Sequence, residues 1–450
     1  MGQKKDITSD INNTADIPTN NFMGKNEVRK MSEFDKIIGY EPIKEELRQL
    51  CDMIHNRDIY GKLGAKMPKG LLLHGDPGIG KTLMAHSFIQ ESDRKAYIIR
   101  RTKHAGDFID EIKRVFIEAA ENAPSIILLD DMDKFVVEDN SKEEYVTIQA
   151  CIDELNDADV YVISTANDLD DIPRSLLRAG RFDRKICVEL PEGDDAAKII
   201  QHYIASKTVD KDLCVDDIAK MLNGKSCADL ETLMNEAALY AGFERCERIS
   251  MKHIVRSVLR NEYGASDSVL AVDTADLEAI AYHEAGHVVV SELQVPGSIG
   301  LASLRTRDDR NGPGGFVVRC KDLKNRAQNV RVNLAGKAAT ELKYGKATEG
   351  GSEDLRRAID NVRGSVIYSA VYGIGAVDVF TNYGGSSADL KERQEAIVHA
   401  EIERFLTQVK QMLTENLGFL DTVAAALLKK ETLLHSDIRK LRESYLKETA

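Results

Sequence analysis

The feature that most constrains the fold of this chain is a glycine-rich segment ending in Gly-Lys-Thr. It fits the pattern G-x-x-x-x-G-K-[ST] and consists of Gly75, Asp76, Pro77, Gly78, Ile79, Gly80, Lys81 and Thr82. An apolar run at residues 71–73 precedes it, and a helical pattern follows. This order predicts a phosphate-binding loop, because glycines let backbone N–H groups close around phosphate oxygens at a helix N-terminus. We expect Lys81 to reach the β- and γ-phosphates of ATP and Thr82 to bind Mg²⁺.

A second acidic element supports the same chemistry. The apolar run at residues 125–129 ends in Asp130 and Asp131. A carboxylate at the end of such a strand is a ligand that Mg²⁺ prefers, so Asp130 is the expected metal-side residue. Asp131 stands where a base that activates water is expected.

The spacing of the apolar runs predicts the fold class. Runs at 70–74, 96–99, 125–130, 160–164 and 186–190 alternate with helical patterns. This alternation indicates an α/β domain with a parallel sheet covered by helices on both faces. The strand signals stop after Pro191, and mainly helical patterns follow.

From these patterns we divide the 450 residues into five segments. Residues 1–32 are polar and are predicted to form a disordered tail. The α/β core is assigned to residues 33–193 and an all-helical subdomain to 194–263. A Gly/Ser/Asp-rich linker at 264–275 leads to a mainly α-helical domain at 276–450.

The second half contains the pattern H-E-x-x-H, formed by His283, Glu284 and His287 on a predicted helix. The i, i+4 spacing places both imidazoles on one face, where two nitrogens can bind one Zn²⁺. Glu284 is then placed to take a proton from the water that zinc activates and to pass it to a leaving amine. A catalytic zinc site also needs a third protein ligand and an open fourth position.

Composition limits the possible partners and the setting. The formal net charge of −13 argues against general nucleic-acid binding, which needs a basic face. The 7 cysteines include no C-x-x-C pair, so a reducing cytoplasm fits better than a disulfide framework. No stretch approaches the roughly 20 apolar residues of a membrane helix, so no membrane anchor is expected.

Taken with further segments, these motifs resemble the FtsH-like ATP-dependent zinc metalloproteases, in which an AAA ATPase precedes an M41-type peptidase. The resemblance covers residues 33–442. It extends beyond the phosphate loop and H-E-x-x-H to the segments 63–70, 162–167, 176–184, 227–238, 334–342, 350–355 and 427–433.

The resemblance implies further site residues. Asn167 corresponds to the residue that senses the γ-phosphate. Arg181 and Arg184 correspond to arginine fingers that act on a neighbour's nucleotide, which implies a homo-hexameric ring. Asp354 corresponds to the third zinc ligand, with Glu353 and Asp360 as rivals.

The sequence also departs from the family pattern. It shows no counterpart of the N-terminal membrane segments, Asp131 replaces a Glu, and Cys227 replaces a Gly near the adenine. The substrate-gripping loop, aromatic–hydrophobic–Gly in the family, is expected between Tyr97 and Phe108. Here that stretch is short and basic, which favours acidic segments of substrate, and Phe108 is the candidate aromatic residue.

Three functions therefore remain open. The first is ATP-driven cleavage of unfolded or tagged soluble polypeptides, in which an edge strand at residues 314–318 pairs with the substrate or forms an ordinary hairpin. The second is a zinc peptidase with a nucleotide-binding regulatory ring of low ATPase activity. The third is a non-proteolytic AAA remodelling factor with a structural zinc, which the open site disfavours.

Overall fold

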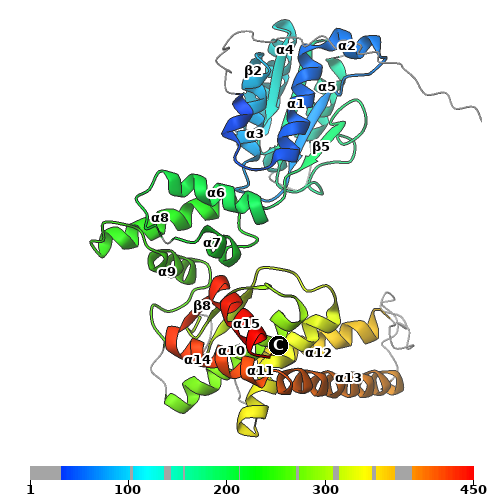
Figure 1. Cartoon of the computed structure of the whole chain (residues 1–450). Helices are drawn as coiled ribbons and strands as arrows, with labels where there is room; N and C mark the ends of the chain where they lie inside the picture. Colours follow the sequence, from blue (N-terminus) through cyan, green and yellow to red (C-terminus); the bar gives the residue numbers. More distant parts are fainter. Residues whose placement is uncertain are drawn as a thin grey trace, which may run out of the picture.

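The computed structural model describes residues 32–101, 105–135, 143–155, 158–211, 213–269, 273–307, 314–346, 351–369 and 388–449. In Figure 1 these residues form an α/β domain, a small helical subdomain and a larger, mainly helical domain that follow one another. The predicted disordered tail lies outside the described residues, apart from Ser32. Among the helices that the structure describes, none is long and apolar enough to cross a membrane.

The first domain is built on a parallel five-stranded sheet, as predicted. Its strands are β1 (Gly70–His74), β2 (Lys95–Ile99), β3 (Ser125–Leu129), β4 (Val160–Ala166) and β5 (Arg184–Cys187), in the order β2-β3-β4-β1-β5. The central strands are continuous apolar runs because both of their faces are covered. The prediction for the last strand, residues 186–190, was shifted. Register with β1 begins at Arg184, and beyond Cys187 only the Val188 N–H still reaches β1.

Two hydrophobic clusters hold helices against the two faces of this sheet. On one face, Leu71 and Leu73 pack with α1 (Glu41–His55) and α3 (Lys81–Glu91). On the other, Leu72 packs with α4 (Ala105–Glu121) and α5 (Glu143–Glu154). Because β1 side chains alternate between faces, α3, which follows the phosphate loop in the chain, packs on the face of Leu71 and Leu73. The short elements η1 (Glu33–Lys36), α2 (Arg57–Lys62) and η2 (Met132–Phe135) complete the domain.

The structure corrects the expected role of Phe108. This residue lies inside α4, is 0% exposed, and meets the ring of Phe135 edge-on at 5.0 Å. A side chain committed to the core cannot grip a substrate. Residues 102–104 of the predicted basic loop lie outside the described residues.

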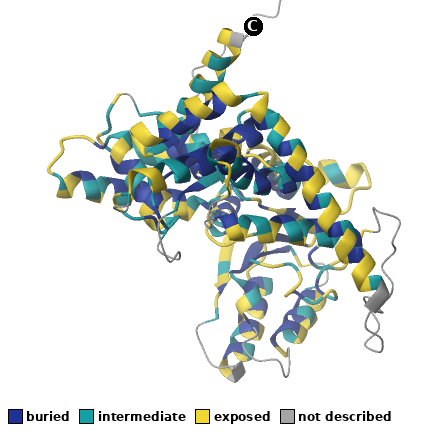
Figure 2. Cartoon of the chain, turned by 90° about the horizontal axis from the view of Figure 1, so that it is seen from below, coloured by how far each residue is buried: buried dark blue, intermediate teal, exposed yellow. Residues whose placement is uncertain are grey.

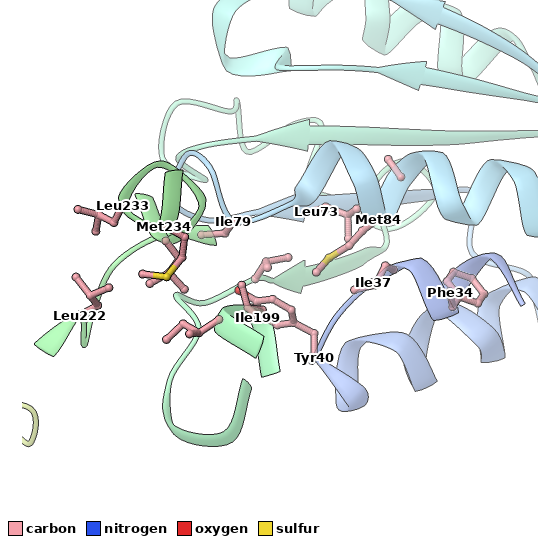
Figure 3. Packing of buried hydrophobic residues seen from close by; sticks show 14 of the residues in the cluster. Phe34, Ile37, Tyr40, Leu73, Ile79, Met84, Ile199, Leu222, Leu233 and Met234 are labelled. Atoms are coloured by element: carbon pink, nitrogen blue, oxygen red, sulfur yellow. The ribbon is translucent and has the colours of Figure 1, made fainter. Parts of the chain in front are cut away.

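The helical subdomain covers the phosphate loop. It consists of α6 (Gly193–Ala205), α7 (Val215–Met221), α8 (Cys227–Phe243) and α9 (Met251–Asn261). Figure 3 shows how Ile199 of α6 and Leu233 of α8 continue the hydrophobic cluster that begins at Phe34 and Leu73 in the α/β domain. We call this subdomain the lid.

The C-terminal domain surrounds one central helix, α10 (Thr274–Gln294). Around it lie α11 (Arg326–Tyr344), α12 (Ser352–Ile367), α13 (Ala388–Thr414), α14 (Leu417–Lys430) and α15 (His435–Thr449). A small antiparallel sheet has the order β7-β6-β8, with β6 (Ile299–Ser303), β7 (Phe316–Arg319) and β8 (Thr432–Leu434). Figure 2 shows buried residues gathered where these helices meet. The three-residue β8 was not predicted, because it lies within a long stretch of helical periodicity.

The lid rests directly on this small sheet. A Cβ added at Gly300 of β6 would lie 2.3 Å from the carbonyl oxygen of Lys220 in α7. The Asp217 carboxylate of α7 also accepts hydrogen bonds from the backbone N–H and the hydroxyl of Ser436, at 2.8 and 2.7 Å. The lid and the C-terminal domain are therefore joined by polar and close backbone contacts.

Candidate active sites

A pocket between the α/β domain and the lid contains the phosphate loop. It is lined by Ile38, Tyr40, residues 77–84, Asp131 and Asn167 from the core and by His202, Tyr203, Cys227 and Ala228 from the lid. Gly78 has a positive φ of 76°, and a Cβ there would lie 2.9 Å from the Ser226 hydroxyl. The Ala228 N–H donates to the Gly78 carbonyl at 3.0 Å. Glycine at this position thus lets the lid close on the loop.

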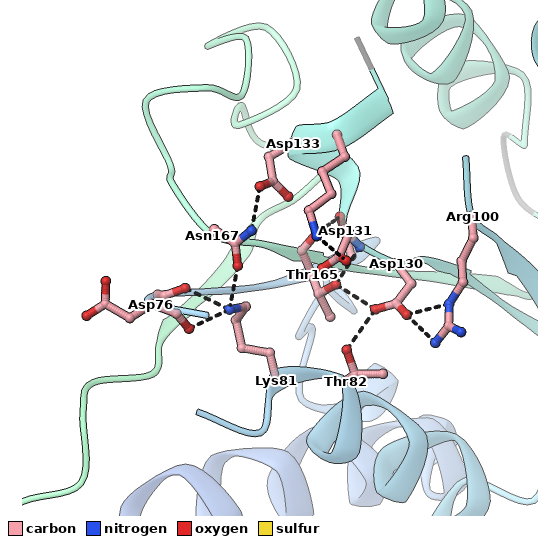
Figure 4. Close-up of polar contacts among 12 residues, drawn as sticks. Asp76, Lys81, Thr82, Arg100, Asp130, Asp131, Asp133, Thr165 and Asn167 are labelled. Atoms are coloured by element: carbon pink, nitrogen blue, oxygen red, sulfur yellow. Dashed lines mark hydrogen bonds and ion pairs between the residues drawn. The ribbon is translucent and has the colours of Figure 1, made fainter. Parts of the chain in front are cut away.

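Lys81 and Asn167 belong to one polar network in this pocket (Figure 4). The Lys81 ammonium donates to the carbonyls of Gly75 and Asp76, both at 2.7 Å, and to the Asn167 amide oxygen at 3.0 Å. The Asn167 amide nitrogen donates to Asp133 at 2.8 Å. Burial lowers the pKa of Lys81. Both predicted phosphate-contacting side chains therefore lie at the mouth of the loop.

Thr82 and Asp130, the two predicted Mg²⁺ ligands, lie in direct contact. The Thr82 hydroxyl donates to the Asp130 carboxylate at 3.0 Å, and Thr165 donates to the same oxygen at 2.8 Å. Burial acts to raise the pKa of Asp130, but hydrogen bonds, led by that from Thr165, hold it below its usual value. An ionised carboxylate beside a hydroxyl fits Mg²⁺.

Arg100 also occupies this site, which the sequence did not indicate. Its Nε donates to the second Asp130 oxygen at 2.7 Å (Figure 4). Arg100 follows the end of β2, in the basic stretch where the substrate-gripping loop was expected, and the pairing of β2 with β3 places it beside Asp130 instead. An anion held by a guanidinium is less available to a cation.

Asp131 lines the pocket in an unusual backbone conformation. Its φ is 56°, its N–H donates to the Thr165 hydroxyl at 2.8 Å, and its carboxylate accepts from Lys134 at 2.8 Å. The predicted water-activating carboxylate is therefore present at the pocket and engaged in an ion pair.

The two candidate arginine fingers do not line this chain's own pocket. Arg181 donates to both Asp153 oxygens, at 2.9 and 2.8 Å. Arg184 approaches Glu46 at 3.8 Å with half-exposed side chains. Their action on a neighbouring chain stays a prediction.

The H-E-x-x-H helix and α12 bring three metal-ligating groups together. His283 and His287 lie on α10, and their Nε2 atoms are 3.1 Å apart. Asp354 lies on α12, and its Oδ2 is 3.2 Å from each of these nitrogens. A tetrahedral zinc site with bonds of 2.0–2.2 Å separates its ligand atoms by about 3.3–3.6 Å, slightly more than the spacing seen here. The three groups therefore fit Zn²⁺ and leave a fourth position open within the described residues.

Contacts behind the ligands orient them. His287 Nδ1 donates to the Val332 carbonyl at 2.8 Å, which leaves Nε2 as the ligand atom. The imidazole of His283 packs on Gly336, where a Cβ would lie 2.4 Å from Nε2. Burial acts to raise the pKa of Asp354, but hydrogen bonds from both histidines hold it far below its usual range. The ligand set is thus preformed around an ionised carboxylate.

The rival third ligands point elsewhere. Glu353 pairs with Arg356 and Arg357, and the hydrogen bond from Arg356 lowers the pKa of Glu353 to about 2. Asp360 pairs with Arg356 and Arg363. The structure brings only Asp354 of these three to the histidines.

Glu284 is buried beside this site, with 5% of its surface exposed. A Cβ at Gly315 would lie 2.5 Å from its Cγ, so the glycine before β7 makes room for the carboxylate. A cleft lined by Glu284, His287 and Asp354 continues along β7, which is an edge of its sheet. β7 pairs with β6 as a hairpin and also presents the open edge that a substrate strand needs.

A second group of potential ligands, Glu244, Cys246 and His253, lies at the far end of the lid. Glu244 already pairs with Lys252 and Arg256, whose charges oppose a cation. All 7 cysteines of the chain are free.

Comparisons with known proteins agree with this geometry. Residues 71–190 match the model of the "ATPase family associated with various cellular activities (AAA)", and residues 270–441 match "Peptidase family M41". An "ATP-dependent zinc metalloprotease FtsH" from Leptotrichia buccalis is 30% identical over 94% of this chain and 59% of its own length. Relatives of the same name from Ureaplasma parvum and Helicobacter pylori strain 26695 are each 28% identical, over 90% and 92% of this chain and 60% and 71% of their own lengths.

The chain thus spans about six-tenths of the length of the first two relatives. The matches to both family models lie on the two domains that contain the sites described above. The parallel-sheet domain with its phosphate loop and the helical domain with its H-E-x-x-H site identify the chain as an FtsH-like protein, with an AAA ATPase domain followed by an M41 peptidase domain.

Proposed function

We propose that this protein is an ATP-dependent zinc metalloendopeptidase that cleaves unfolded or tagged soluble polypeptides. One observation supports this most strongly. His283, His287 and Asp354 are spaced for one zinc ion, and the buried carboxylate of Glu284 lies in the same cleft.

The residues of the cleft have distinct roles in peptide hydrolysis. Zinc, when bound, polarises the scissile carbonyl and lowers the pKa of water. Glu284 accepts a proton from the attacking water and returns it to the leaving amine. The edge of β7 offers backbone N–H and carbonyl groups that hold an extended substrate beside Glu284.

The nucleotide pocket supplies the motor in this proposal. The N–H groups of the phosphate loop and Lys81 bind the phosphates, while Thr82 and Asp130 bind Mg²⁺. Asp131 orients the attacking water, and Asn167 senses the γ-phosphate. Residues 181 and 184 act on the nucleotide of the next subunit in a homo-hexameric ring. The relatives' name, ATP-dependent zinc metalloprotease, supports coupling between the two sites.

A second function, a zinc peptidase with a regulatory ring of low ATPase activity, is favoured by specific contacts. Asp130 is engaged by Arg100, and Asp131 by Lys134. Phe108, the aromatic residue expected to grip substrate, is buried. The two ion pairs act against fast ATP hydrolysis, and the burial of Phe108 acts against threading of the substrate.

Degradation of a loosely folded protein by the purified, zinc-loaded enzyme separates these functions. The reaction is run with ATP, with a non-hydrolysable analogue and without nucleotide, and Glu284→Gln serves as the control for contaminating proteases. Cleavage that requires ATP hydrolysis supports the motor. Equal cleavage under all three conditions leaves a zinc peptidase beside an idle or regulatory ring and removes the threading mechanism. Cleavage that persists in Glu284→Gln removes the proposed peptidase.

A further inference from the structure

The peptidase cleft is basic, although the chain as a whole carries a net charge of −13. Apart from Glu284 and the zinc ligand Asp354, its charged lining residues are Arg307, Arg319, Lys321, Asp322 and Arg357. These comprise four cations and one anion. The cleft therefore has a local charge opposite in sign to that of the whole chain, which attracts anionic ligands.

Arg319 is the cation best placed to read a bound substrate. It ends β7, the edge strand along which an extended substrate would lie. Its guanidinium donates to the neutral amide oxygen of Asn329 on α11, at 3.2 Å. Among the described residues no carboxylate forms a salt bridge with it. Desolvation by the surrounding protein lowers the pKa of Arg319, partly offset by the charge of Asp322. Arg319 is exposed and forms no salt bridge among the described residues, so its guanidinium can donate charge-assisted hydrogen bonds to a substrate carboxylate.

The position of Arg319 relative to Glu284 sets the distance at which it acts. Gly315, where an added Cβ would contact Glu284, precedes Arg319 by four residues at the other end of β7. Four residues of extended strand span about 13 Å. Arg319 therefore meets a substrate side chain about four residues from the scissile bond.

Cations also border the cleft beyond Arg319. Lys321 lies two residues after Arg319 and donates to the Pro296 carbonyl at 3.1 Å, which leaves its charge without a carboxylate among the described residues. Arg357, one turn after Asp354, shares its charge with Glu353 at 3.1 Å. The cleft therefore presents positive charge from both β7 and α12.

We propose that the peptidase cleft selects polypeptide segments that carry aspartate or glutamate about four residues from the scissile bond, with Arg319 as the specificity-determining residue. This inference rests on the proposed peptidase function, since it assumes that an extended polypeptide occupies the cleft. It concerns which segments bind, and not whether ATP drives their delivery.

A binding experiment tests the selectivity without requiring turnover. Zinc-loaded Glu284→Gln protein is titrated against three fluorescently labelled, unstructured peptides, and fluorescence anisotropy gives each Kd. The peptides are identical except that alternate positions carry Glu, Gln or Lys. We expect the Glu peptide to bind about tenfold more tightly than the Gln peptide, a ratio typical of a charge-assisted hydrogen bond. The Lys peptide should bind most weakly, and added salt should reduce the differences.

Arg319→Gln, added to Glu284→Gln, should reduce the preference for the Glu peptide to about twofold or less while leaving the Kd of the Gln peptide nearly unchanged. Arg439→Gln is the matched control, because Arg439 lies on α15 with its side chain 56% exposed and outside the cleft lining. It should keep the full preference. Circular dichroism and zinc content confirm that each variant is folded and loaded.

Equal affinities for the three peptides, or an unchanged preference in Arg319→Gln, would overturn the inference. Binding of none of them would overturn it as well. These outcomes are distinct from failure of the proposed function, which is judged by cleavage with unmodified Glu284. A protein that cleaves Glu and Gln peptides at the same kcat/KM remains a peptidase and lacks the selectivity.

Discussion

Replacing Gly336 by alanine should specifically damage the zinc site. The added Cβ would lie 2.4 Å from both Cε1 and Nε2 of His283 and 2.6 Å from Nδ1, whereas ordinary contacts lie at 3.4–4 Å. The imidazole must therefore move by roughly 1 Å, and zinc tolerates deviations of only about 0.2 Å in its bond lengths. We expect zinc affinity to fall about 10–100-fold, which corresponds to about 1.4–2.8 kcal/mol.

Competition with a chromophoric zinc chelator measures this loss directly and does not depend on peptidase activity. Gly364→Ala is the matched control, since it makes the same chemical change within the neighbouring helix α12. The nearest atom to its new Cβ is Arg326 Nη1 at 3.7 Å. This variant should bind zinc like the unaltered protein and gain about 0.5–1 kcal/mol of stability from the better helix former.

Overpacking also acts on folding, so the metal-free forms are compared by thermal unfolding. Gly336→Ala should cost about 1–3 kcal/mol there, and zinc titrations are carried out well below its midpoint. A folded Gly336→Ala protein that binds zinc with unchanged affinity would refute the assignment of His283 as a ligand packed against this glycine.

Three further changes test other parts of the sites. Gly315→Ala should push the Glu284 carboxylate aside and lower kcat about 10²-fold, with zinc content unchanged by metal analysis. Arg100→Ala should free the Asp130 carboxylate and tighten Mg²⁺-nucleotide binding about 5–10-fold. This effect is smaller than loss of a fully buried ion pair would give, because the Arg100 side chain is half-exposed. Titration with a fluorescent nucleotide, with and without Mg²⁺, would give the same Kd for both proteins if the ion pair does not affect binding. Zinc removal should lower the Tm measured by differential scanning calorimetry. Relative to protein in zinc at 100 times its Kd, the free energy of unfolding should fall by about 2.7 kcal/mol.

Local motifs made part of this structure predictable. The residues of the phosphate loop and of the H-E-x-x-H helix are close together in the sequence, so their local geometry could be predicted from the motif alone. Asp354 is 71 residues from His283, and only the family resemblance indicated it. The parallel sheet followed from buried apolar runs, while the shift of β5 depended on register with β1.

The failures have a shared physical cause, because they involve contacts between distant segments. Phe108 has the residue type of a substrate-gripping aromatic, but α4 directs it onto Phe135 in the core. Arg100 is an ordinary basic residue until β2 pairs with β3 and places it at Asp130. Neither outcome has a signal in the local sequence, since both depend on which elements become neighbours.

The junction between α7 and the small sheet has a consequence for how force could travel through the molecule. Gly300 lies close to the Lys220 carbonyl, and Asp217 accepts two hydrogen bonds from Ser436, so the lid and the C-terminal domain have little room to move against each other. The lid also closes over the phosphate loop through Ala228. If the protein hydrolyses ATP as proposed, a nucleotide change that tilts the lid would turn the C-terminal domain with it, because these contacts join the two. The orientation of the cleft, rather than its shape, would then follow the bound nucleotide.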